Sequence, residues 1–179
     1  QDLLLERHYL DGNVQLSSVG KWKGWQIPGM KKLRGTETSV FEPNSCTWSP
    51  TVPNEWALSE KLQPYFKLHG SSNWVDGHGV QLLVMGGNKS TTIQQHEILR
   101  RYFEIFVEYL SSEDVRLMVI GYNFGDGHIN RVILDSTLKN GLKLFIADPA
   151  GESVTDKISA NASRNGMPRE RFIVGISNS

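Results

Sequence analysis

The feature that most constrains the fold is a regular alternation of apolar runs and amphipathic segments in the second half of the chain. The apolar runs are VRLMVIG (115–121), LKLFIAD (142–148) and RFIVGI (171–176). Between them lie GHINRVILDSTL (127–138) and SVTDKISANAS (153–163), whose apolar residues recur at helical spacing. Continuous apolar runs joined by single helices are typical of parallel strands with right-handed crossovers. The pattern predicts an α/β fold with a parallel sheet and flanking helices.

The part of the chain before this alternation is less regular. The sequence predicts a helix at the start (1–10), an irregular segment with one or two short elements (11–63), strands at YFKL (65–68) and VQLLVM (80–85), and a long helix in HEILRRYFEIFVEYL (96–110). The turn-rich stretch HGSSNWVDGHG separates the two strands. We therefore expect one domain over 1–179, with a helix plus an irregular segment at 1–63 and a regular α/β part at 64–179.

Composition excludes several classes of protein. Nineteen basic and nineteen acidic residues cancel, so no net field draws the chain to nucleic acid or to an anionic membrane. The single cysteine, Cys46, cannot form an internal disulfide, and metal sites built from CxxC pairs are excluded. The five histidines lack the HExxH spacing, so no metal is expected. Without a long apolar run or a secretory pattern, the expected location is the cytoplasm.

The most informative loop is VIGYNFGDGHIN (119–130), which follows an apolar strand and opens a helix. Gly121, Gly125 and Gly127 allow tight turns and close backbone approach. A helix N-terminus carries free N–H groups, so this loop can hold a phosphate or ribose hydroxyls, and Asp126 can instead cap the helix. A glycine turn that serves packing alone is the other interpretation, because GxxxGxG differs from the dinucleotide fingerprint GxGxxG.

Other residues at strand ends are weaker candidates. Asp148 ends a predicted strand, where a carboxylate can accept hydrogen bonds from both ribose hydroxyls, although Asp before Pro is also common in turns. VMGGNKS (84–90) can approach a phosphate but lacks P-loop spacing. Trp74 and Tyr122 can line a flat ring or close the core.

His69 lies in a predicted turn beside a glycine. An imidazole there can transfer protons near neutral pH, whereas the commoner role is that of a hydrogen-bonded turn histidine.

Three motifs in this order resemble the sirtuin-like NAD-binding family, in its bacterial branch without a zinc ribbon. They are KLHGSSNW (67–74), VIGYNFGDGHINRVI (119–133) and LFIAD (144–148). The resemblance implies a Rossmann-like parallel sheet and NAD as substrate or ligand. It implies His69 as the catalytic base at the nicotinamide ribose. The implied NAD contacts are Gly121, Tyr122, Asn123, Phe124, Asp126 and, at the adenosine ribose, Asp148, where the family usually has asparagine.

The start of the chain also resembles this family. QDLLLERHYL is similar to the segment that follows the catalytic asparagine of a TxNxD motif, with Asp2 as its aspartate. By this resemblance the chain is the C-terminal portion of the domain, without the first glycine-rich βα unit. We expect the portion alone to be inactive and to pair with a complementing N-terminal segment or with a second copy.

The function that the resemblance implies is hydrolysis of NAD to nicotinamide and ADP-ribose. The family members with this activity include effectors of bacterial anti-phage defence. Three alternatives remain open. The first is a nucleotide sensor that binds without cleavage. The second is an NAD-dependent deacylase, although ribbon-containing deacylases carry four cysteines that are missing here. The third is a scaffold fragment that associates through bare sheet edges.

Overall fold

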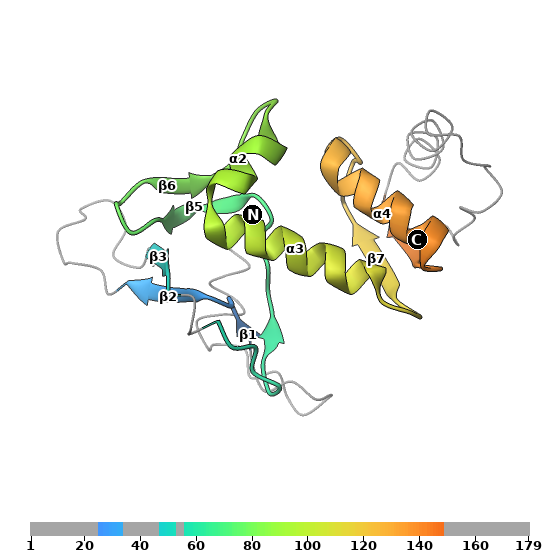
Figure 1. Ribbon diagram of the computed structural model, residues 1–179, viewed down its shortest axis with the longest axis horizontal. Helices are drawn as coiled ribbons and strands as arrows, with labels where there is room; N and C mark the ends of the chain where they lie inside the picture. The colour runs from blue at the N-terminus through green and yellow to red at the C-terminus, as the bar shows by residue number, and fades with distance from the viewer. Residues whose placement is uncertain (1–24, 34–46, 53–55, 149–179) are drawn as a thin grey trace. The chain divides into compact units, whose positions relative to one another are not determined.

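The computed structural model describes residues 25–33, 47–52 and 56–148 (Figure 1). The chain divides into two compact units, Gln1–Phe103 and Glu104–Ser179, with the boundary inside a helix. The predicted helices at 1–10 and 153–163, the predicted strand at 171–176 and Cys46 lie outside the described residues.

The first unit contains a four-stranded mixed sheet and a separate pair of short strands. The sheet has the order β2-β3-β5-β6, formed by β2 (Met30–Leu33), β3 (Thr47–Pro50), β5 (Gly70–Val75) and β6 (Gln81–Leu83). Its pairs β2–β3 and β5–β6 are antiparallel, whereas β3–β5 is parallel. The separate parallel pair joins β1 (Trp25–Gln26) to β4 (Gln63–Pro64). The segment predicted to be irregular therefore contains more strands than expected.

The prediction of a strand at 65–68 is wrong, because the strand lies at 70–75, in the stretch that looked like a turn. Gly, Ser and Asn are poor strand formers, but pairing with β3 on one side and β6 on the other determines the backbone here. Ser71 and Trp74 are each 0% exposed, so burial stabilises this placement. The predicted strand at 80–85 is confirmed as the shorter β6.

A tight turn joins β5 to β6. The Asp76 carboxylate accepts hydrogen bonds from the backbone N–H groups of Val80 and His78, both at 2.8 Å. The bond from Val80 contributes most to holding the pKa of Asp76 below its usual value, because it favours the ionised carboxylate. This is the local chemistry by which Asx residues form turns.

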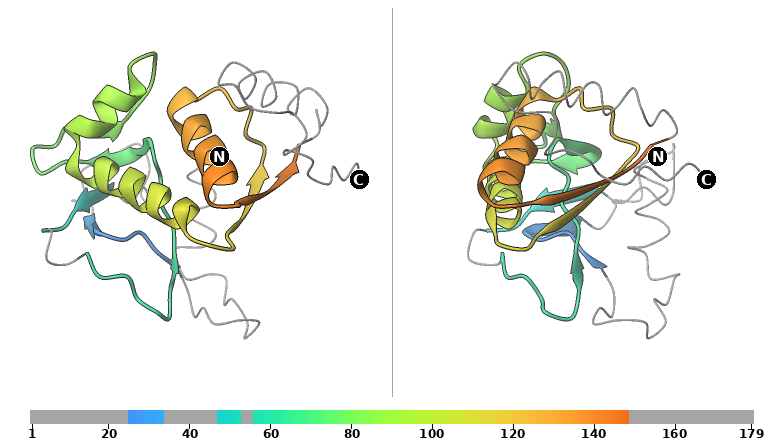
Figure 2. Two further views of the ribbon diagram at one scale, coloured as in Figure 1. Left: turned by 45° about the vertical axis from the view of Figure 1, so that its right-hand side comes forward. Right: turned by 90° about the vertical axis from the view of Figure 1, so that its right-hand side faces the viewer.

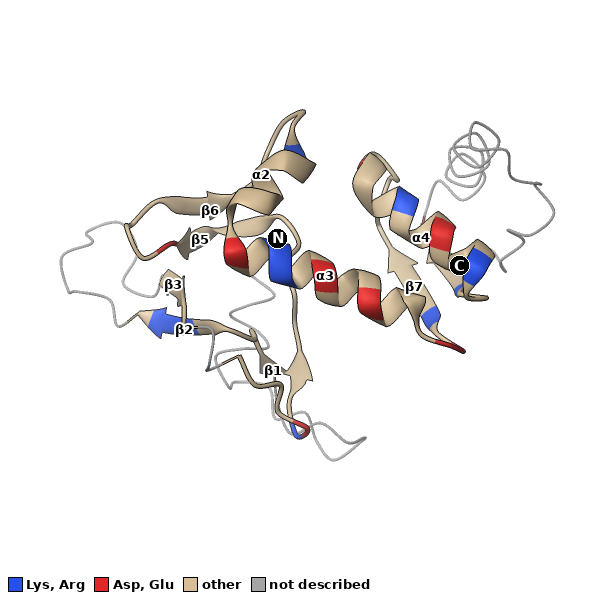
Figure 3. Ribbon diagram, in the orientation of Figure 1, with Lys and Arg blue, Asp and Glu red and all other residues tan. Residues whose placement is uncertain are grey.

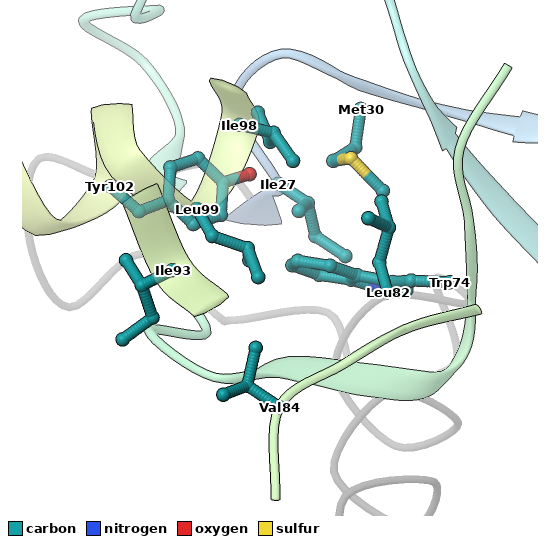
Figure 4. Close-up of a cluster of buried hydrophobic side chains, with 9 residues drawn as sticks. All are labelled: Ile27, Met30, Trp74, Leu82, Val84, Ile93, Ile98, Leu99 and Tyr102. Atoms are coloured by element: carbon teal, nitrogen blue, oxygen red, sulfur yellow. The ribbon is translucent and has the colours of Figure 1, made fainter. Parts of the chain in front are cut away.

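The core of the first unit lies between the sheet and two helices, α2 (Lys89–Gln95) and α3 (Glu97–Ser111). Figure 4 shows its buried side chains, which are Ile27, Met30, Trp74, Leu82, Val84, Ile93, Ile98, Leu99 and Tyr102. The Tyr102 ring meets Trp74 edge-on at 6.0 Å between centroids, and its hydroxyl donates to the Pro28 carbonyl. Burial raises the pKa of Tyr102.

Helix α3 confirms the long amphipathic helix predicted at 96–110. Its buried residues recur at three- and four-residue steps, as expected for one apolar stripe, and they are Ile98, Leu99, Tyr102, Ile105 and Leu110. The charged residues predicted to face away from the core, Arg100, Arg101, Glu104 and Glu108, are all exposed. Figure 3 shows the acidic and basic positions along this helix.

The described part of the second unit contains a strand–helix–strand unit, which confirms the first of the two predicted crossovers. β7 (Arg116–Ile120) runs parallel to β8 (Lys143–Ala147), and α4 (Gly127–Lys139) connects them. Figure 2 shows α4 beside the two strands. The core beneath the helix is formed by Leu110, Val119, Phe124, Ile133, Leu134, Leu142 and Leu144.

The opposite face of this strand pair is open to solvent. Met118 is 66% exposed, Ile120 73% and Phe145 43%. Among the described residues, the buried cluster of this unit lies on the other side of the strand pair. The described fold is thus an α/β arrangement with small, mixed sheets in place of one parallel sheet. Among the described residues, no helix is long and apolar enough to span a bilayer.

Candidate functional site

The register of β7 and β8 places two of the predicted binding segments side by side. Ile120 pairs with Ala147, and the Gly121 N–H donates to the Ala147 carbonyl at 3.2 Å. Gly121 and Asp148 therefore follow neighbouring strands at the same edge of the sheet. Carboxyl ends of parallel strands are where open α/β sheets bind ligands. This edge, with the loop that follows Gly121, is the candidate site of the second unit.

The loop makes two unusual backbone turns. Gly121 has φ +63°, a conformation that glycine adopts without strain. Phe124 has φ +55° although it carries a bulky side chain, which costs about 1–3 kcal/mol. Phe124 is 5% exposed and its ring centroid lies 4.8 Å from that of Tyr122, so packing retains the strained residue. Strain of this kind is concentrated at functional sites.

A hydrogen-bond network closes the loop onto the first turn of α4. The Tyr122 hydroxyl donates to Asn130 Oδ1 at 3.0 Å and accepts from the Asp126 N–H at 3.2 Å. The Asn130 amide donates to the Phe124 carbonyl at 2.7 Å. The Gly125 N–H donates to Asn123 Oδ1 at 2.9 Å. The loop is therefore ordered by its own side chains.

Within this network Tyr122 acts as a neutral hydroxyl. Burial, and to a smaller extent the negative charge of Asp126, raise the pKa of Tyr122 to about 12, although a hydrogen bond with the Asp126 backbone opposes the shift. The phenol is thus protonated at neutral pH. Its ring packs against the core of the second unit, so this residue shapes the loop from the inside.

Asp126 occupies the N-cap position of α4. Its backbone carbonyl accepts the Asn130 N–H at 3.0 Å, but its side chain makes no capping hydrogen bond. The alternative in which this carboxylate caps the helix is therefore not realised. A carboxylate at this position is stabilised by the helix dipole, and it suits hydroxyl groups, which donate hydrogen bonds, better than phosphates.

His69 belongs to the first unit and lies in a tight turn. The Gly70 N–H donates to the Lys67 carbonyl at 3.0 Å, and the His69 carbonyl accepts from the Val84 N–H at 2.9 Å. Gly70 has φ +72°, and a Cβ there would lie 1.9 Å from the Leu82 carbonyl oxygen. The backbone at His69 is consequently set by close packing against β6, and its side chain is partly buried.

A buried lysine supports the same turn and was missed by sequence reasoning. Lys67 is 7% exposed, and its ammonium donates to Ser71 Oγ at 2.7 Å. The ammonium also lies 5.5 Å from the centre of the Trp74 ring and 5.8 Å from that of Tyr65. Charge-assisted and cation–π contacts of this kind stabilise a buried cation. The only hint in the sequence was a lysine inside the apolar run YFKL.

The remaining sequence candidates belong to the first unit. Gly86, Gly87, Lys89 and Ser90 lie where β6 leads into α2, a helix of only seven residues. Trp74 is fully buried, so it closes the core as the alternative interpretation stated. Asn130 was not singled out in the sequence, although an amide on the apolar face of an amphipathic helix is the kind of signal that identifies such a residue.

No protein-family model, no curated protein and no solved structure matches this chain.

Proposed function

We propose that this chain is the NAD-binding part of an enzyme that hydrolyses NAD to nicotinamide and ADP-ribose. The observation that carries the proposal is the shared edge of β7 and β8, where a strained, self-braced loop opens α4 and Asp148 follows the adjacent strand. In this proposal β7, α4 and β8 are one unit of a Rossmann-like fold of the sirtuin-like family. The motifs KLHGSSNW and VIGYNFGDGHINRVI support the assignment.

Each part of the edge has a role in holding the dinucleotide. Asp148 accepts hydrogen bonds from the two hydroxyls of the adenosine ribose, because a carboxylate offers acceptors to both. The loop from Gly121 to Asp126 lies at the positive end of the α4 dipole and contacts the rest of the dinucleotide. Asn123 and Gly125, which are exposed, provide the surface for that contact.

The proposed reaction replaces one bond at the anomeric carbon of the nicotinamide ribose with another. The bond to nicotinamide breaks, and its electron pair neutralises the pyridinium ring. A water oxygen forms the new bond to the same carbon, through an oxocarbenium-like transition state. His69, as a neutral imidazole, accepts the proton that the water or a ribose hydroxyl loses.

The test is a paired measurement of nicotinamide release and NAD binding. It uses this chain and a version extended upstream through the segment that the resemblance places before Gln1. Release that is lost in His69→Ala, in a variant that retains the circular dichroism of the parent, supports the proposal. Saturable binding without release in either version favours a sensor. NAD-dependent loss of an acyl group from a lysine peptide favours the deacylase, and absence of NAD binding in both versions overturns the proposal.

A further inference from the structure

Asn130 holds an amide in the core of the second unit. It lies in the first turn of α4 and is 6% exposed. Asparagine is a poor helix former, and a buried amide is costly unless its donors and acceptor have partners. A residue of this type on the apolar face of a helix therefore requires specific polar neighbours, and those neighbours are in the candidate loop.

The amide contacts the loop at two points. Its Nδ2 donates to the carbonyl of Phe124 at 2.7 Å, which is the residue with the strained backbone. Its Oδ1 accepts from the Tyr122 hydroxyl at 3.0 Å. One rigid side chain thus fixes both the strained peptide and the aromatic residue that packs beside it.

The Tyr122 hydroxyl extends this bracing to the start of the helix. It donates its one proton to Asn130, since that contact is shorter than the 3.3 Å contact with the Asp126 carbonyl, and it accepts the Asp126 N–H at 3.2 Å. Its raised pKa keeps the hydroxyl protonated at neutral pH. Phe124 and Asp126 are therefore held by a single chain of hydrogen bonds that begins at Asn130.

We propose that Asn130 is a positioning residue for the candidate ligand loop. It holds Phe124 directly and Asp126 through the Tyr122 hydroxyl, and it thereby keeps the loop in the conformation that binds the dinucleotide. The identity of the ligand in this proposal rests on the proposed function, but the hydrogen bonds that hold the loop are present without a ligand. A loop that is ordered beforehand loses less entropy on binding, so its affinity is higher. Asn130 touches no substrate in this role.

The test compares two variants with a control. Asn130→Asp keeps the size and the acceptor but removes the donor to Phe124. Tyr122→Phe keeps the ring and removes the hydroxyl. Thr137→Ala is the control, because it removes a side-chain hydrogen bond within α4, from Thr137 to the Ile133 carbonyl, away from the loop.

The first readout needs no ligand. We expect amide hydrogen exchange at Asp126, measured by NMR, to accelerate at least about tenfold in Tyr122→Phe, because its acceptor is lost. In Asn130→Asp we expect faster exchange across Gly125 and Asp126, and Thr137→Ala should leave both amides unchanged. Unchanged exchange in both loop variants overturns the bracing.

The second readout separates positioning from folding. In calorimetric titrations with NAD we expect the two loop variants to bind about tenfold more weakly at unchanged stoichiometry, a factor that corresponds to about 1.4 kcal/mol. A purely structural role predicts the reverse, with fewer binding-competent molecules and an unchanged Kd. Faster exchange with an unchanged Kd also overturns the positioning role. If neither this chain nor its upstream-extended version binds NAD, the proposed function falls, and hydrogen exchange alone decides whether Asn130 braces the loop.

Discussion

Replacing Gly70 with alanine tests how the His69 turn is built. Two separate costs oppose the substitution. Alanine at φ +72° is strained by about 1–2 kcal/mol. Its Cβ would also lie 1.9 Å from the Leu82 carbonyl oxygen, so β5 and β6 must separate, and overpacking of this kind costs about 1–3 kcal/mol. We expect Gly70→Ala to lower the free energy of unfolding by about 2–5 kcal/mol.

The hairpin that follows contains two glycines that separate these costs. Gly79 has φ +79°, but no atom lies within 4 Å of the position that an added Cβ would occupy, so Gly79→Ala should cost only the strain, about 1–2 kcal/mol. Gly77 lies outside the positive-φ region and also has open space around it. Gly77→Ala should therefore be neutral or stabilising by up to about 1 kcal/mol.

The assay is urea denaturation followed by tryptophan fluorescence. All five tryptophans precede residue 104, so the signal reports on the first unit alone. With a urea dependence of about 2 kcal/mol per molar, Gly70→Ala should shift the midpoint down by about 1–2.5 M. Equal midpoints for Gly70→Ala and Gly79→Ala would refute the reasoning, because the close approach to Leu82 would then contribute nothing.

Three further predictions concern charged and titrating groups. In competition binding, Asp148→Asn should improve the affinity for NADP relative to NAD about tenfold, because the 2′-phosphate of NADP no longer meets a carboxylate. An unchanged ratio of the two affinities would place the adenosine ribose elsewhere. Since the pKa of Tyr122 is raised to about 12 from its ordinary value near 10, its contribution to stability is complete below pH 10 and is lost as the pH rises through 12. In a pH titration followed by tyrosinate absorbance, the unsubstituted protein should show an increase near pH 12 that is absent in Tyr122→Phe. If the unsubstituted protein shows no such increase, the packing of the loop described here is contradicted. Lys67→Met should destabilise the first unit by about 1.5–3 kcal/mol, because Ser71 Oγ is left buried without its donor. Adding Ser71→Ala should recover part of the loss. Identical urea midpoints for Lys67→Met and the unsubstituted protein would contradict this.

Sequence alone predicted the elements whose pattern is local. Helix α3 and the succession β7, α4 and β8 follow from the spacing of apolar residues, because each such element must bury one face. The location of the candidate loop followed in turn, since a loop after a parallel strand emerges at the ligand-binding edge of the sheet. The position of Asp148 beside this loop is shown by the structure, in the in-register pairing of β7 with β8.

Only the tertiary structure decided the features that depend on residues far apart in the chain. β5 is a strand because β3 and β6 flank it, although its own residues favour turns. The face of β7 and β8 that carries Met118 and Phe145 is exposed, because the buried cluster packs against the other face. A continuous apolar run has no periodicity that could show which face is buried. The roles of Lys67 and Asn130 depend on which atoms face them, and hydrogen-bond partners of buried polar groups are determined by three-dimensional packing.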